Sequence, residues 1–238
     1  MPISIDDFDL VKGAYVSTLD CYVTTSSNRN QKLIAFAGGV GQYDDGEPSI
    51  NKVELIYGSN PDFTPEIFGS QWFDPPDFGE AGGWALNWAG YFDNPSKGSS
   101  QQIRVTFNSS IMYGFLGVYA LSYAKTGAAD DNDIRTGDVT HLTSELSPVE
   151  NESVHLSACC CSGSYIPVTG LGLTRDAYQT QSYFFGYIHG AIGHELRSVL
   201  GSDTLRWFIN VAAPMLETAI NIGYANTKAQ NPFVPNLC

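Results

Sequence analysis

Three groups of residues carry side chains that could do chemistry, and the first is the histidine–glutamate cluster in HGAIGHE. A zinc protease of the H-E-x-x-H type needs two histidines one helical turn apart, with the glutamate directly after the first. Here His189 and His194 are five residues apart, and Glu195 follows the second histidine. The spacing therefore favours a solvent-facing helix end over a metal site.

The second group is the run Cys159, Cys160 and Cys161. Neighbouring residues on a strand point to opposite faces, so three consecutive thiols do not converge on one ion. We expect core packing instead, with two thiols on one face of a strand and one on the other. With Cys21 and Cys238 the chain has five cysteines, a poor disulfide framework. Free thiols in a protein folded in a reducing cytoplasm are the expectation.

The third group is an acidic segment over residues 128–138. Its oxygen-bearing side chains are Asp130, Asp131, Asn132, Asp133 and Asp138. A calcium loop of the EF-hand type needs Gly at its sixth position and Glu at its twelfth. Counted from Asp131, these positions hold Thr136 and Leu142. The segment therefore favours a solvated acidic turn, and no cofactor is expected, with Ca²⁺ as the alternative.

Other catalytic signals are weak. The sequence has no G-x-S-x-G nucleophile elbow and no glycine-rich phosphate loop. A carboxylate pair of the glycosidase type stays open, because such pairs meet across strands without a fixed sequence spacing. We predict a protein that is not an enzyme.

The charge balance restricts the partners. The formal net charge is −13, from 12 basic and 25 acidic residues. Nucleic acids and anionic membrane surfaces both require a basic footprint. No apolar stretch approaches the roughly 18 residues of a transmembrane helix, and MPISIDDFDL lacks the basic and apolar regions of a secretion signal. We expect neither a nucleic-acid nor a membrane partner.

The elements that must position these residues are mainly strands. In Gln102–Asn108, apolar and polar residues alternate, which is typical of a half-buried antiparallel strand. Ile111–Ala124 is apolar on both faces and predicts a central strand. Gly190–Leu200 predicts one short helix, because its apolar residues recur near one helical face. Gly58–Gly83, rich in proline and aromatic residues, predicts a long loop.

The predicted fold is an all-β, antiparallel, jelly-roll-like β-sandwich. Residues 1–13 would form an N-terminal arm or edge strand, residues 14–225 a single sandwich domain, and residues 226–238 a C-terminal tail. No internal repeat is evident in the sequence. We expect Trp84 and Trp88 to be core residues.

The long loop is the candidate interaction surface, because exposed aromatic side chains anchor partner proteins. Its expected anchors are Phe63, Phe68, Trp72, Phe73 and Phe78, with Asp74 and Asp77 setting the register against basic partner surfaces. For Trp72 and Phe73, interface and core are equally weighted.

The order of strand motifs resembles a β-sandwich module of tailed-bacteriophage structural proteins. The motifs are KLIAFAGG, KVELIYG, WALNWAGYFDNPSKGSSQQIRVTFNSS and MYGFLGVYALSYAKT, with SVHLSACC, LRWFINVA and ETAINIGYA where the closing strands would lie. The resemblance covers residues 14–225. The long loop and the helix-like insert depart from the short turns of that module.

This resemblance implies a virion structural protein, either a capsid decoration or cement protein or a head–tail accessory protein. Such a protein would be made in the host cytoplasm, self-associate, and dock on neighbouring capsid or tail proteins in the virion. The alternative is a carbohydrate-binding β-sandwich for glycan or host-surface attachment. In that case Trp72, Trp84 or Trp88 would serve as stacking platforms for sugars.

Overall fold

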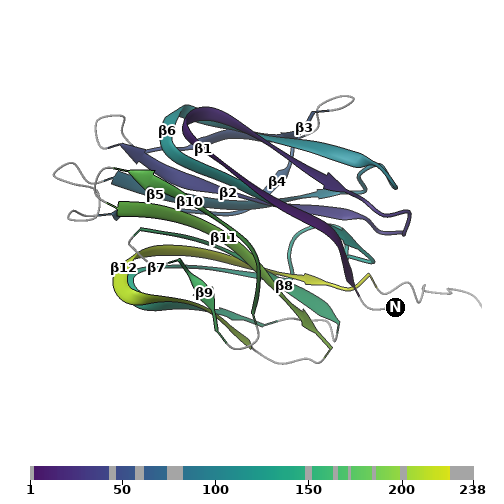
Figure 1. Cartoon of the computed structure of the whole chain (residues 1–238). Coiled ribbons are helices and arrows are strands. Elements are labelled where there is room, and N and C mark those ends of the chain that lie inside the picture. The colour runs from purple at the N-terminus through teal and green to yellow at the C-terminus, as the bar shows by residue number, and fades with distance from the viewer. Residues whose placement is uncertain are drawn as a thin grey trace, which may run out of the picture.

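The computed structural model describes residues 3–42, 47–56, 62–73, 83–147, 152–162, 166–170, 173–183, 186–198 and 203–225, and all its regular elements there are strands (Figure 1). The strands are β1 (Ser4–Thr24), β2 (Lys32–Gln42), β3 (Ile50–Leu55), β4 (Thr64–Phe73), β5 (Gly83–Asp93), β6 (Ser100–Ser122), β7 (Asp131–Leu146), β8 (Ser153–Ser162), β9 (Val168–Thr169), β10 (Thr174–Tyr183), β11 (Gly186–Arg197) and β12 (Asp203–Gly223).

These strands form two six-stranded antiparallel sheets that lie face to face (Figure 1). The first sheet has the order β1-β6-β2-β5-β4, and β3 adds to β6. The second has the order β10-β11-β8-β12-β7, and β9 adds to β12. The predicted all-β, antiparallel class is therefore confirmed.

The predicted helix over Gly190–Leu200 is wrong in the part that the structure describes. Residues up to Arg197 belong to β11, which pairs with β10 on one side and β8 on the other. Ile192 and Leu196 share a face at a spacing of four, which fits the strand period of two as well as a helix. Two ladders of backbone hydrogen bonds favour the strand.

The predicted loop over Gly58–Gly83 is also interrupted by a strand, β4. Pro65 has no N–H to donate, but β4 is at the edge of its sheet, where such a residue is tolerated. A register shift lies between Pro65 and Ile67. In the acidic segment, residues from Asp131 onward likewise form β7 rather than a turn.

Each sheet folds back over its own outer face. β1 pairs with β6 along its whole length, with a register shift between Val16 and Thr18. The bend brings the two ends of β1 together, so that the Thr24 N–H donates to the Asp7 carboxylate over 2.7 Å. In the second sheet the Ser147 N–H donates to Asp131 in the same way, over 2.6 Å.

The folding back creates three cores. One lies between the sheets and includes Phe36, Phe115 and Ile192. The other two lie inside the folded first sheet, around Val105 and Leu116, and inside the folded second sheet, around Trp207. Cys160 belongs to the central core, whereas Cys159 and Cys161 belong to that of the second sheet. The expected division of these thiols, two on one face and one on the other, is confirmed, and all three are free and buried.

The two sheets have the same topology, which the sequence did not reveal. If six is added to each strand number of the first sheet, its order becomes that of the second sheet read from β7 to β10. The added strand β3 likewise becomes β9. Even the bulge recurs, between Pro65 and Ile67 in β4 and between Arg175 and Ala177 in β10. Because β1 packs near β10 and β4 near β7, an approximate two-fold rotation relates the halves. The chain is two equivalent units, residues 3–124 and 125–225.

Candidate functional site

The predicted interface residues fall into four classes of position. Phe63 is buried in the core of the first sheet, with its ring centroid 5.8 Å from that of Phe92. Phe68 is 48% exposed on the edge strand β4. Trp72 and Phe73 belong to β4, but their side chains lie outside the described part. Outside the described residues altogether are Asp74, Asp77 and Phe78. Of the two expected core tryptophans, Trp88 is buried and Trp84 is half-buried.

Exposed aromatic residues occupy equivalent positions on β4 and β10, which are one edge strand of each sheet. Phe68 of β4 lies opposite Trp88, and Tyr178 of β10 lies opposite Ala191, at matching points of the two sheets. Tyr178 is 42% exposed, close to the value for Phe68. The Arg175 guanidinium lies 4.6 Å from the centroid of the Tyr178 ring. Each half therefore presents an aromatic side chain at the equivalent point of one of its edge strands.

A polar triplet joins the two sheets next to β10. Asp176 occupies the bulge of β10, where its carboxylate accepts a hydrogen bond from the Tyr119 hydroxyl over 2.6 Å. The Nδ1 atom of His194 lies 2.7 Å from the same carboxylate oxygen. Burial, and then the negative charge of Asp176, raise the pKa of Tyr119 well above its usual value. With Nδ1 engaged, Nε2 is the ring nitrogen that remains for a further contact.

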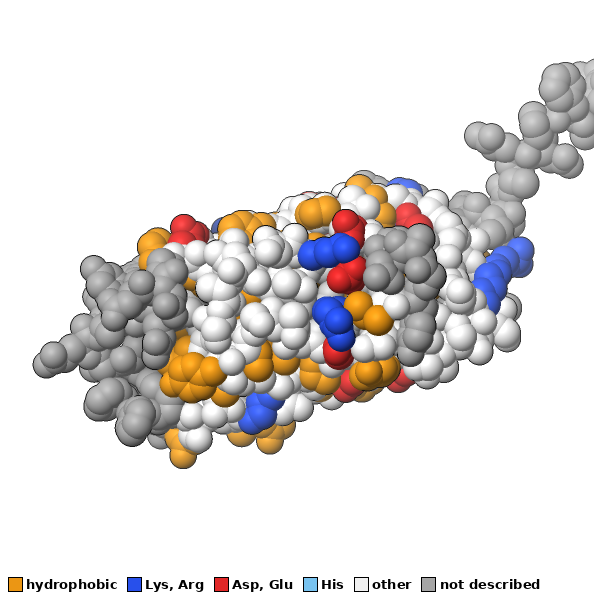
Figure 2. Space-filling view, turned by 90° about the horizontal axis from the view of Figure 1, so that it is seen from above, with side chains coloured by type: hydrophobic (Ala, Val, Ile, Leu, Met, Phe, Trp, Pro, Cys, Tyr) orange, Lys and Arg blue, Asp and Glu red, His pale blue; other side chains and the backbone are white. Residues whose placement is uncertain are grey.

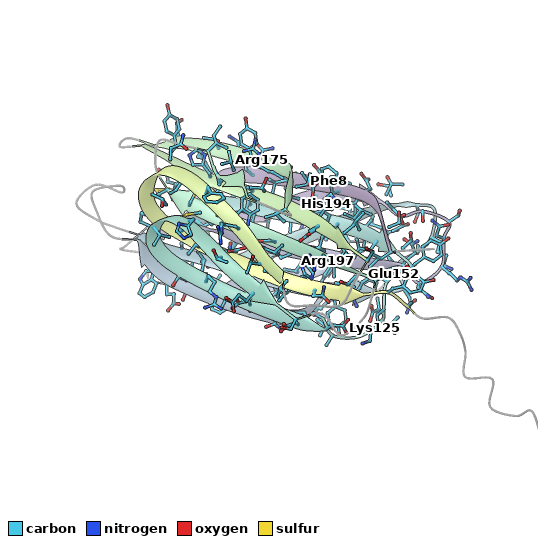
Figure 3. All side chains as sticks on the ribbon, turned by 90° about the horizontal axis from the view of Figure 1, so that it is seen from below. Phe8, Lys125, Glu152, Arg175, His194 and Arg197 are labelled. Atoms are coloured by element: carbon cyan, nitrogen blue, oxygen red, sulfur yellow. The ribbon has the colours of Figure 1, made fainter. Side chains whose placement is uncertain are left out.

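His194 forms part of the wall of an open groove of about 780 Å³ between the start of β1 and the end of β11. The other principal lining residues are Ile3, Ile5, Phe8, Tyr123 and Leu196. Figure 3 shows Phe8 and His194 close together at this groove. An oriented imidazole at an apolar wall can hydrogen-bond a backbone or a small polar group.

Sequence reasoning weighed His194 as a metal ligand and favoured a solvent-facing helix end. Among the residues that the structure describes, no three His, Cys, Asp or Glu side chains gather as a metal site would require. The carboxylate partner, Asp176, comes from the bulge of a neighbouring strand. Antiparallel pairing sets no fixed sequence distance between residues that meet across strands, so no sequence motif predicts this contact.

A second polar cluster is fully buried in the core of the folded second sheet. The Ser157 hydroxyl donates to Glu217 over 2.8 Å and accepts from the Trp207 indole N–H over 2.8 Å. Ser144 lies beside the Glu217 carboxyl. Burial is the largest cause that raises the pKa of Glu217, to about 7. At acidic pH this carboxyl is therefore held neutral inside the protein.

The equivalent positions in the first half hold apolar residues. The strand registers make Leu116 equivalent to Glu217, because Leu116 lies opposite Ala37 as Glu217 lies opposite Cys159. By the same comparison, Ala35 replaces Ser157. In the sequence, Glu217 is simply the first residue of the motif ETAINIGYA. Only the fold-back of β12 over its own sheet buries it.

The comparisons with known proteins identify no family for this chain, so its function has to be inferred from the residues described above. No family model matches the chain, and no curated protein sequence matches it. Within the described ranges, no helix is long and apolar enough to cross a membrane.

Proposed function

We propose that this protein is a structural component of a tailed-phage particle, a capsid decoration or head–tail accessory protein. It acts by self-association and by docking on neighbouring virion proteins through the edges of its sheets. The observation that carries this proposal is that β4 and β10, one edge strand of each sheet, each carry an exposed aromatic residue at an equivalent position. The resemblance of the strand motifs to tailed-phage proteins supplies the setting.

The physical basis is strand addition. An edge strand presents a row of N–H and C=O groups that a partner strand can pair with. A neighbouring aromatic side chain adds buried area and fixes the position of the partner. Phe68 and Tyr178 meet this requirement on β4 and β10. Because the two edges are related by the approximate two-fold rotation, one chain can link two neighbours, as a cement protein must.

The outer face of the first half is unlike these edges. Figure 2 shows a row of alternating basic and acidic side chains there. Arg104 pairs with Asp20 over 2.7 Å, and Lys52 pairs with Glu54 over 2.6 Å. The registers place Asp20, Arg104 and Glu54 side by side across β1, β6 and β3. These charges are satisfied within the chain, so this face favours solvent and leaves the edges for docking.

A second candidate function is glycan attachment, and a specific observation favours its position. Tyr178 and Tyr187 are both exposed. Tyr178 lies opposite Ala191, and Tyr187 is four residues from Ala191 on β11, so both tyrosines share the outer face of the second sheet. Exposed aromatic rings beside Arg175 form a surface on which a sugar can stack.

The experiment that tests the docking proposal is the native mass of the full chain by light scattering over a range of concentrations. We expect a discrete oligomer. The Phe68→Lys/Tyr178→Lys double variant should be monomeric. Tyr187→Lys is the matched control, because Tyr187 is an exposed aromatic residue on β11, which lies between β10 and β8 and is not an edge strand, and this variant should keep the wild-type mass. A wild-type monomer that responds only to polysaccharide would support the glycan function instead.

A further inference from the structure

The two ends of the molecule that the approximate two-fold rotation relates differ in their chemistry. The strand registers make Val154 the counterpart of Lys32. At the first end, the buried Lys32 ammonium donates to Asp93 over 2.8 Å and to the Lys125 carbonyl over 3.0 Å. The Gly127 N–H donates to the other oxygen of Asp93 over 2.6 Å. Charged side chains therefore bind peptide groups at the first end.

At the second end, the counterparts of these charged residues are apolar, and the groove beside His194 lies there. Lys32 lies opposite Asp93, whereas Val154 lies opposite Leu196. Leu196 is 55% exposed and lines the groove. Among the lining residues that the structure describes there is no carboxylate, and His194 is the one basic side chain. The groove therefore combines an apolar wall with a single imidazole.

The hydrogen bonds behind His194 determine what its other ring nitrogen can do. An ionised carboxylate only accepts hydrogen bonds, so Nδ1, which lies 2.7 Å from Asp176, carries the proton of this contact. In the neutral ring, Nε2 is then an acceptor with a free lone pair. The Tyr119 hydroxyl donates to the same carboxylate over 2.6 Å, and the Asp176 side chain is only 5% exposed. His194 is thus held as an oriented base.

The rest of the described lining favours a ligand with one polar head over a peptide. Two of the polar lining side chains pair with each other, since the Tyr123 hydroxyl donates to the Asn28 side-chain oxygen over 3.2 Å. Ile5, Phe8 and Leu196 supply the apolar lining. A peptide backbone carries an N–H and a C=O at nearly every residue and would find few partners on these side chains. An alkyl chain needs none.

We propose that this groove binds a free aliphatic monocarboxylic acid, with its alkyl tail along Ile5, Phe8 and Leu196 and its carboxyl group at Nε2 of His194. A carboxylic acid is a stronger acid than an imidazolium ion. The acid's proton therefore ends on Nε2: its O–H bond breaks, an N–H bond forms, and a carboxylate faces the imidazolium. The charges then alternate from ligand to His194 to Asp176, and each neighbouring pair shares a charge-assisted hydrogen bond.

The size of the groove is compatible with such a ligand. Its volume is about 780 Å³, and small-molecule sites usually measure roughly 300–1,000 Å³, with mostly apolar walls and a few oriented polar groups. Figure 3 shows Phe8, from the apolar lining, close to His194. The tail and the head of one short fatty acid therefore reach their partners together. This inference goes beyond the proposed function and does not depend on it.

Calorimetric titration of the full chain with decanoate, below its micelle concentration, tests the proposal. We expect saturable binding of one decanoate per chain. His194→Gln and Leu196→Ser should each weaken it about tenfold or more, because the first removes the charged partner and the second removes buried apolar area. The matched controls are His141→Gln, at an exposed histidine on β7, and Val168→Ser, at an exposed site on β9. Both should keep the wild-type affinity.

A second measurement follows the ring nitrogens of His194 by ¹⁵N NMR at pH 8. Decanoate should move the Nε2 signal towards its protonated position, and the methyl signals of Leu196 should shift with the same midpoint. Should His194→Gln fail to fold, the Nε2 signal and Leu196→Ser decide the question. Leu196 is an exposed residue, so its replacement leaves the core intact.

Three outcomes would overturn the proposal. The first is the absence of saturable decanoate binding to a folded wild-type protein. The second is an equal affinity of wild type and a folded His194→Gln variant. The third is equally tight binding of decyltrimethylammonium, which has the same tail and a cationic head, because this would show a surface that takes any alkyl chain and does not recognise a carboxylate.

Discussion

The two halves of this protein share a topology but fill equivalent positions with opposite chemistry. The core inside the first sheet uses Ala35 and Leu116 where the second uses Ser157 and Glu217. Both cores are fully buried at these positions. The comparison teaches that strand order, register and bulges define the fold, while the chemistry of a core can change where polar side chains pair with one another.

The difference also gives the second half a sensitivity that the first half lacks. The stability of an aliphatic core does not depend on pH, whereas a buried carboxyl destabilises the fold least when it is protonated. Glu217 accepts a hydrogen bond from Ser157, which itself accepts from Trp207. Removing one member leaves its partners buried with unmet hydrogen bonds, so the cluster acts as a unit.

The largest expected effect on stability comes from placing a carboxyl in the core of the first half, which lacks hydrogen-bond partners for it. Leu116→Glu places a carboxyl beside Ala35 and Ala37, which offer no hydrogen bonds, and should lower the free energy of unfolding by about 5 kcal/mol. Urea denaturation at pH 7 measures this change in the free energy of unfolding. Glu217→Leu is the matched reverse change and should cost about 1 kcal/mol. Equal losses for the two variants would contradict the comparison.

The next effect is the pH dependence of stability. The pKa of Glu217 is raised in the folded protein from 4.5 to about 7, so its stabilising contribution is complete below pH 4.5. It is lost as the pH rises through 7, with a total of about 3 kcal/mol. Denaturation of wild type and Glu217→Gln at pH 5 and pH 8 checks this. Between pH 5 and pH 8 the difference between the two proteins should change by about 2.5 kcal/mol, and an unchanged difference would refute the assignment.

A smaller effect is expected from Ser157→Ala. The change removes the acceptor of the Trp207 N–H and a donor to Glu217, and should cost about 2 kcal/mol. The control is Ala35→Ser, the reverse change at the equivalent position of the first half. The near-ultraviolet circular dichroism of Trp207 should change only in Ser157→Ala. A spectrum like that of wild type would show that the indole does not need this hydroxyl.

The sequence was sufficient for the fold class and for several faces, but not for contacts between distant strands. The alternation of buried and exposed side chains in Gln102–Asn108, and the division of the three adjacent cysteines between two faces, follow from the strand period alone. The helix expected over Gly190–Leu200 fails because Ile192 and Leu196 fit both periods, and strand pairing decided between them. The repeat of the two halves is one of backbone pairing, since equivalent positions hold residues as different as Leu116 and Glu217.

The candidate sites were harder to predict for the same reason. The Asp176–His194 contact depends on a bulge in β10, and the Glu217 cluster depends on the fold-back of β12. Neither has a fixed spacing in the sequence. Phe68 was predicted from its segment rich in proline and aromatic residues, but its counterpart Tyr178 follows only from the strand registers of the two sheets.

The most direct test of the account is the mass distribution of single-edge variants by sedimentation velocity. If β4 and β10 are two equivalent docking edges, Phe68→Lys alone and Tyr178→Lys alone should each limit the wild-type oligomer to a dimer through the edge that remains. The double variant should sediment as a monomer. Single variants that keep the wild-type distribution, or a wild-type protein that is monomeric at every concentration, would contradict the central claim.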